Sequence, residues 1–323
     1  MPTIRLNPSQ SIQQAIGFIA PGQPAELILG PGVYREKLRI DKPGLTLCGE
    51  GNSPRDVVIT NDDYANKRHP TDGKEYNTFR TYTVNILAPH VTLRGLTVEN
   101  AAGDPVHKGQ SVALSVYGDN AFIENCVLSS TQDTLFCGPL PDDLIVRYDG
   151  FLPDEERCHE GEMLQLFYKC TIEGSVDFIF GCANAWFYGC DIVSVNDTRE
   201  FGFVAAPAHS LKQRAGFQFV DCGFRHTGCK DASVFLARPW RDFGKAAFVD
   251  CALDAHIRPE GFDPWNDTRR DSTARFSIGG STHLPKAVSW SQKLSDADAQ
   301  TLRNDCARYF SSHNVCAVFP SNR

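Results

Sequence analysis

The sequence lacks any apolar run long enough to cross a lipid bilayer, and it does not begin with a charged segment followed by an apolar core. We therefore expect neither a transmembrane helix nor a signal peptide, and we predict a cytoplasmic protein with secretion as the alternative. An excess of positive charge is also missing, because 32 Lys and Arg stand against 39 Asp and Glu, a formal net charge of −7. This balance argues against nucleic acid or an anionic membrane as the main partner.

Motifs for metal binding and for serine chemistry are absent from the sequence as well. None of the twelve cysteines forms a pair with the close spacing of a zinc site, and the nine histidines show no close pair. No Gly-x-Ser-x-Gly elbow occurs. The chain is far longer than the small scaffolds that depend on disulfides, so we expect most of its cysteines to be reduced.

What the sequence does contain is a series of short β-like segments punctuated by glycine and proline, without alternation of strands and helices. A pattern of an aromatic residue followed by cysteine recurs, with cysteines at positions 126, 170, 190, 222 and 251, separated by 44, 20, 32 and 29 residues. These intervals suit the coils of a solenoid with variable insertions. A parallel β-helix stacks equivalent residues of successive coils in ladders, so we place these five cysteines in interior columns.

Three segments depart from this repeat. Residues 9–20 predict a short helix at the N-terminal end, with Ile12, Ile16 and Ile19 on one face and Ser9 or Ser11 as N-cap. Residues 138–160 are rich in proline, glycine and charge and predict a long inserted loop. Residues 296–310 predict an amphipathic helix that caps the open end of the stack. We predict one all-β domain over residues 1–323.

One carboxylate, Asp177, lies inside an apolar run that glycines close at positions 174 and 181. If residues 176–180 form a strand, Val176, Phe178 and Phe180 share one face, and Asp177 and Ile179 share the other. A buried carboxylate needs a cationic partner or a raised pKa. The alternative is an aspartate that faces water from a half-buried strand.

Three further polar clusters stand outside the coil pattern, at residues 109–111, 132–136 and 236–240. With Asp177 they supply two carboxylates, two amides, a guanidinium and an indole. Gln110 and Gln132 lie 22 residues apart, which is close to one coil, so we expect the two amides to lie one above the other on the same sheet.

Four sequence blocks resemble the signature blocks of the pectin methylesterases, or pectinesterases, and they occur in the family's order. They are GVYRE at 32–36, QDTLF at 132–136, GSVDFIFG at 174–181 and LARPW at 236–240. Flanking segments at 78–80, 107–114, 165–168 and 256–261 resemble the same family, and the similarity runs from about residue 3 to about residue 290. Some bacterial members carry an insertion similar to 138–160, so we interpret the chain as a bacterial-type member.

The resemblance implies a right-handed parallel β-helix that hydrolyses the C6 methyl esters of galacturonate in pectin or methylated oligogalacturonides, without metal or cofactor. It implies that Asp177 is the nucleophile and that Asp133 is the general acid and base. Gln110 and Gln132 become oxyanion donors, and Arg238 orients Asp177. The substrate-binding residues predicted with them are Trp240, Phe136, Phe180 and Tyr168.

The residue types suit these roles independently of the resemblance. A nucleophilic aspartate must stay ionised, and an adjacent guanidinium such as Arg238 favours that state. Asp133 must carry a proton near neutrality, which burial beside a second carboxylate promotes. Neutral amides stabilise a developing oxyanion without neutralising the neighbouring aspartates.

Other activities fit less well. A glycosidase on a β-helix also uses paired carboxylates, but the Asp pairs at 62–63 and 142–143 lie in loop-like text. A calcium-dependent pectate lyase needs a cluster of acidic ligands, and a carbohydrate-binding module has no need for the five polar residues together. The sequence of residues 275–282 differs from the family's usual pattern, so the resemblance does not predict which residues contact substrate at that end.

Overall fold

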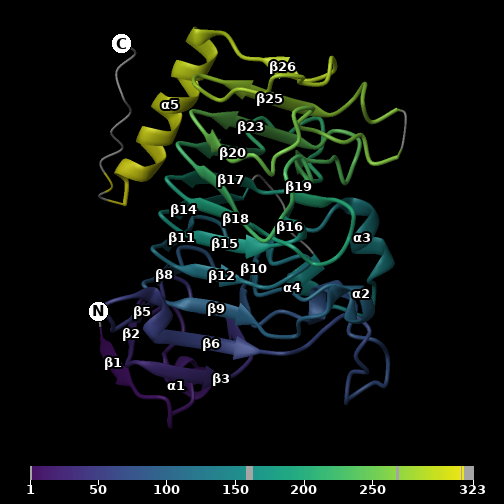
Figure 1. Ribbon diagram of the computed structural model, residues 1–323. Helices are drawn as coiled ribbons and strands as arrows, with labels where there is room; N and C mark the ends of the chain where they lie inside the picture. Colours follow the sequence, from purple (N-terminus) through teal and green to yellow (C-terminus); the bar gives the residue numbers. More distant parts are fainter. Residues whose placement is uncertain (1, 158–162, 267–268, 314, 316–323) are drawn as a thin grey trace.

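The computed structural model describes residues 2–157, 163–266, 269–313 and 315, and it shows a right-handed parallel β-helix (Figure 1). Each complete coil passes through three parallel sheets, which we name A, B and C, and within the described residues the turns at the two ends of the stack lack strands in one or two of them. The fold class predicted from the sequence is confirmed.

Sheet A contains β1 (Thr3–Leu6), β2 (Glu26–Leu29), β5 (Thr46–Gly49), β8 (Thr92–Arg94), β11 (Ala121–Glu124), β14 (Leu164–Tyr168), β17 (Asn184–Tyr188), β20 (Phe217–Val220), β23 (Lys245–Val249), β25 (Arg275–Gly279) and β26 (Gln292–Lys293). Sheet B contains β3 (Gly32–Arg35), β6 (Val57–Asn61), β9 (Thr97–Asn100), β12 (Val127–Ser129), β15 (Thr171–Gly174), β18 (Asp191–Val195), β21 (Gly223–Thr227) and β24 (Ala252–Leu253). Sheet C contains β4 (Leu38–Ile40), β7 (Val84–Ile86), β10 (Leu114–Val116), β13 (Leu135–Cys137), β16 (Val176–Gly181), β19 (Gly202–Pro207) and β22 (Val234–Ala237). The helices are α1 (Ile12–Phe18), α2 (Pro105–Lys108), α3 (Asp142–Arg147), α4 (Asp154–Arg157) and α5 (Asp296–Ser311), with 3₁₀ turns at Pro54–Asp56 and Thr78–Arg80.

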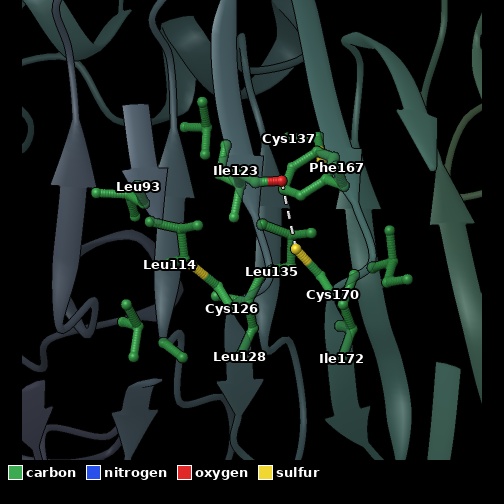
Figure 2. Close-up of a cluster of buried hydrophobic side chains, with 14 of the residues drawn as sticks. Leu93, Leu114, Ile123, Cys126, Leu128, Leu135, Cys137, Phe167, Cys170 and Ile172 are labelled. Atoms are coloured by element: carbon green, nitrogen blue, oxygen red, sulfur yellow. Dashed lines mark hydrogen bonds between the residues drawn. The ribbon is translucent and has the colours of Figure 1, made fainter. Parts of the chain in front are cut away.

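The five repeated cysteines lie inside the coils, as predicted. All five are buried, and four of them donate from Sγ to a main-chain oxygen of the preceding coil: Cys170 to Ile123, Cys190 to Phe167, Cys222 to Phe187 and Cys251 to Phe219, at 3.3 to 3.5 Å. Figure 2 shows the first of these bonds beside Cys126. The thiol is small enough to fit between successive coils, where it packs as a small apolar group. These side chains therefore need no disulfide partner.

An aromatic ladder accompanies the cysteines in the core. The rings of Phe167, Phe187, Phe219 and Phe248 stack from coil to coil, with centroids 4.7, 4.6 and 4.9 Å apart. Between the aromatic strand and each cysteine, the chain turns from sheet A to sheet B through a residue of positive φ, for example Asn125 at 48° and Asp221 at 54°. Asn, Asp and Gly tolerate this left-handed conformation best, and they predominate at this corner.

Both predicted end helices are present. Helix α1 falls within residues 9–20, and Ser11 is its N-cap, because its side chain accepts from Gln14 N. Helix α5 nearly coincides with residues 296–310, but its place differs from the expected one. Cys306 and Phe310 pack against Phe122 and Tyr188 on the outer face of sheet A, and Figure 1 shows α5 running along the side of the stack. The apolar outer face of these strands, rather than the open end, is the surface that it covers.

The tract predicted as a loop at 138–160 contains two short helices, α3 and α4, within its described part, which ends at residue 157. The predicted inserted loop is therefore partly helical. Two acidic residues in the first turn favour α3, and Leu144, Tyr148 and Leu152 pack against Phe79 in a second apolar cluster outside the coils. This burial gives the insertion a fixed place beside sheet C.

Candidate active site

Asp177 lies at a break in strand β16. Its φ is +50°, and the pairing of β16 with β19 shifts between Val176 and Ile179. As a result Phe178 and Ile179 both belong to the interior core, whereas Asp177 and Phe180 line a pocket on the outer side of sheet C. The simple alternation that we predicted for residues 176–180 is therefore wrong, because a bulge with a left-handed residue resets the order of the faces.

Asp133 is presented in the same way one coil earlier. Its φ is +63°, and its amide donates to Val176 O at 3.1 Å just before strand β13 begins. Aspartate tolerates the left-handed conformation better than most residues, so at both positions the backbone can redirect the side chain out of the coil at little cost. Coil stacking thus brings the two carboxylates, 44 residues apart in sequence, into one pocket.

The pocket has a volume of about 530 Å³ and is lined by all five predicted catalytic residues. Its lining includes Gln110, Gln132, Asp133, Asp177, Phe180, Arg238, Trp240 and Trp265 on the β-helix, and Leu144, Arg147 and Tyr148 from the insertion. Ser111 N donates to Gln132 O at 3.1 Å, so the two glutamines stand on adjacent coils as predicted.

Arg238 holds Asp177 with two hydrogen bonds. Its Nε donates to Asp177 Oδ1 at 2.8 Å and its Nη2 donates to Oδ2 at 2.6 Å. The guanidinium lies over the ring of Phe203 at 3.8 Å and over that of Trp265 at 3.9 Å. A bidentate pair between aromatic rings leaves the carboxylate little freedom to rotate.

The two carboxyl groups differ in their electrostatic setting, although each residue is only 7% exposed. Burial and then the charge of Asp177 raise the pKa of Asp133 well above its usual value. Burial also raises the pKa of Asp177, against the opposing charge and hydrogen bonds of Arg238. We expected Arg238 to lower this pKa outright, but burial outweighs it. Arg238 makes its two charge-assisted hydrogen bonds to Asp177, so this carboxyl group is the one suited to lose its proton first.

The predicted sugar-binding residues separate into three groups. Trp240 and Phe180 line the pocket and meet edge to face, with ring centroids 5.7 Å apart. Phe136 is fully buried beneath Phe180 and does not line the pocket, so its predicted contact with substrate is wrong. Tyr168 is on the outer face of sheet A, where it packs against Phe310 of α5, and it belongs to another side of the molecule.

Residues that sequence reasoning missed complete the site. Trp265 flanks Arg238, and Tyr148 donates from its hydroxyl to Asn77 Oδ1 at 2.6 Å, which joins the insertion to the pocket rim. Arg199 donates to the side chain of Gln132. None of the three lies in the coil repeat or in the four blocks, so no sequence signal distinguished them from ordinary loop residues.

Two searches of the described residues concern metals and membranes. No group of three or more His, Cys, Asp or Glu side chains is placed to hold a metal ion within the residues that the structure describes. Over the same residues, no helix has both the length and the apolar character required to span a membrane.

Comparisons with known proteins agree with the fold and the blocks. A family model described as Pectinesterase matches residues 8–139 and 159–312, and the unmatched stretch lies inside the insertion. The pectinesterase QRT1 of Arabidopsis thaliana is 29% identical over 297 residues, which are 88% of this chain and 70% of that protein. Because this relative is a plant protein, the assignment of the chain to the bacterial type stays a prediction.

Solved structures share the architecture. The pectin methylesterase PemA of Erwinia chrysanthemi superposes with a TM-score of 0.76 at 24% identity, covering 98% of both chains. A pectin methylesterase in complex with a hexasaccharide superposes with a TM-score of 0.75 at 24% identity, covering 96% of this chain and 95% of that one. The family match over most of its length shows that this chain belongs to the pectinesterases, a family of carboxylic ester hydrolases.

Proposed function

We propose that this protein removes C6 methyl esters from galacturonate residues of pectin or methylated oligogalacturonides and releases methanol. The observation that carries the proposal is the pairing of unequal carboxyl groups in one pocket. Arg238 holds Asp177 with two hydrogen bonds, whereas burial and the charge of Asp177 raise the pKa of Asp133. One group is suited to attack and the other to donate a proton.

In the first half of the reaction, a carboxylate oxygen of Asp177 attacks the ester carbonyl carbon. The carbonyl oxygen becomes an oxyanion, which the amide N–H groups of Gln110 and Gln132 stabilise. When the carbon–oxygen bond to methoxide breaks, Asp133 gives its proton to the leaving oxygen and methanol departs. The product is an anhydride between Asp177 and the sugar carboxyl group.

In the second half, Asp133 is ionised and accepts a proton from water, whose oxygen attacks the anhydride. The bond to Asp177 breaks, the sugar leaves as a carboxylic acid, and both aspartates return to their starting states. Of the two protons of water, one replaces the proton that Asp133 gave to methanol, and the other is released to solvent when the product ionises to a carboxylate. Trp240 and Phe180 offer an apolar surface against which a sugar ring can pack.

The direct test is methanol release from highly methylated pectin, measured together with the appearance of free carboxylates. We expect equal amounts of both. New reducing ends without methanol indicate a glycosidase, an unsaturated product indicates a lyase, and binding without turnover indicates a carbohydrate-binding module. Any of these three results overturns the proposal.

Gln110 provides a test of the oxyanion role. We expect Gln110→Ala to lower kcat by about 10² to 10³, the usual effect of losing one oxyanion donor, with a much smaller change in KM. The fold should tolerate the change, because the main-chain oxygen of Gln110, which accepts from Ala65 N, remains. Gln300→Ala on the exposed side of α5 is the matched control. An effect on KM alone would make Gln110 a substrate-positioning residue.

We also propose a cytoplasmic location and a preference for short methylated oligogalacturonides. The ten described cysteines have no disulfide partner, and eight of them are buried, which suits a reducing compartment. At the pocket rim, Arg241 donates to Asp143 of α3 at 2.9 and 2.6 Å, and this pair stands between the pocket and a neighbouring hollow. We expect this contact to make the insertion narrow the path of a long polymer.

Two measurements check this proposal. Thiol titration in denaturant without reductant should find nearly all twelve cysteines reactive in protein from its natural source. The ratio kcat/KM should be higher for short methylated oligomers than for polymeric pectin. Several disulfides together with a strong preference for polymer would contradict both parts.

A further inference from the structure

Arg199, in the segment between β18 and β19, joins three side chains, one of which, Gln132, lines the pocket. Its Nη1 donates to Gln132 Oε1 at 2.7 Å, and its Nη2 donates to Ser175 Oγ at 3.2 Å. Its Nε donates to both carboxylate oxygens of Asp197 at 3.1 and 2.9 Å. The side chain of Asp197 is only 9% exposed and that of Arg199 is 29% exposed, so water screens this network only in part.

The contact with Arg199 determines which end of the Gln132 amide faces the reacting groups. A guanidinium has donors only, so the amide atom that it contacts must be the oxygen. The amino end is therefore turned away from Arg199, and Gln132 is one of the influences that oppose the rise in the pKa of Asp133. In this orientation Gln132 presents N–H groups, as an oxyanion donor must.

The same guanidinium connects the two segments that carry the aspartates. Gln132 immediately precedes Asp133, and Ser175 stands two residues before Asp177, whose backbone is also left-handed. Burial is the largest influence on the pKa of both aspartates, and the charge of Arg199 opposes its effect in each case. The paired carboxylate of Asp197 balances the charge of Arg199 and holds its side chain in place.

We propose that Arg199, held by Asp197, is a positioning residue that keeps the amide of Gln132 in its donor orientation. The inference rests on the function proposed above and deepens it, because it adds a residue that contacts no substrate atom. Without Arg199, the amide is free to turn over and to present its oxygen to the developing oxyanion. The partial negative charge on the amide oxygen of Gln132 would then repel the oxyanion in the transition state. Substrate binding would change little.

A double-mutant cycle tests this role, with Arg199→Met, Gln132→Ala and their combination measured by methanol release at the pH optimum of each variant. We expect Gln132→Ala to lower kcat by about 10² to 10³ and Arg199→Met by about 10 to 10², both at nearly unchanged KM. Because Arg199 acts through Gln132, the double variant should be no slower than Gln132→Ala within about twofold. The acidic limb of the profile should move to higher pH in Arg199→Met, since a cation beside both carboxylates is lost.

Two further variants complete the design. Arg225→Met removes an exposed arginine that pairs with Asp254 on sheet B, and we expect wild-type kinetics from it. Arg199→Lys keeps the charge but not the forked donors, so kcat should fall about tenfold while the pH profile stays in place. This variant carries the test if Arg199→Met does not fold.

The results that overturn the inference are distinct from failure of the proposed function. If wild-type protein releases no methanol, the function itself is wrong. If wild-type protein is active but Arg199→Met lowers kcat by the same factor with and without the Gln132 side chain, Arg199 does not act through Gln132. An unchanged kcat in Arg199→Lys, or a change in KM alone, overturns the inference equally.

Discussion

Replacing Asp177 by Asn should abolish methanol release, with kcat lowered by at least about 10³. The amide is nearly the same size as the carboxylate and can still accept a hydrogen bond from Arg238, so the pocket should keep its shape. It cannot attack the ester carbonyl, and no covalent intermediate can form. Binding of pectin or of a methylated oligomer should survive, which direct binding measurements can check beside the assay.

The control for this variant is Asp191→Asn, which makes the same chemical change at an exposed position on β18 of sheet B. We expect it to behave as wild type. If Asp177→Asn retained activity within tenfold of wild type, Asp177 would not be the nucleophile. If Asp177→Asn loses both its activity and its normal thermal unfolding transition, Asp177→Glu takes its place as the test. This variant keeps the charge but moves the carboxylate by one methylene.

Replacing Asp133 by Asn should lower kcat by about 10² to 10⁴, the usual contribution of a positioned general acid and base. Methoxide is a poor leaving group without a proton, and the water of the second step loses its base. Rapid-mixing measurements should therefore show slow methanol release even in the first turnover. A variant with fast first release and slow later turnovers would confine Asp133 to the second step.

The pH dependence of Asp133 has a defined sign. Its pKa is raised in the folded protein by burial and by the charge of Asp177, so it keeps its proton to higher pH than an exposed aspartate. Activity should fall as pH rises through this pKa, and the falling limb should be absent from the residual activity of Asp133→Asn. Ionisation of this buried group also costs stability as pH rises above the value for the unfolded chain. Asp133→Asn should then unfold at higher temperature than wild type at neutral pH, but not in acid.

The sequence by itself determined the architecture of this protein. A β-helix repeats one interior environment in every coil, so an aromatic residue and a cysteine recur at each turn and are readable without coordinates. The chemistry of the site could also be predicted from the sequence. Asp133, Asp177 and Arg238 lie within the four blocks that resemble the family's signatures, and a carboxylate in an apolar run needs a partner. The end helices followed from their amphipathic spacing, since a helical face is a local property of the chain.

Only the tertiary structure decided where these elements and side chains point. The left-handed conformation of Asp177 breaks the expected alternation of faces in β16, and Asp133, which is also left-handed, donates from its amide to Val176 O of the next coil. Tyr168 and Phe136 are aromatic residues of a type that can bind a sugar. However, Tyr168 packs against Phe310 of α5, and Phe136 is buried beneath Phe180. Arg199 reaches Gln132 across 67 residues because coils stack. Such contacts depend on the packing of segments distant in sequence, and local residue patterns carry no record of that packing.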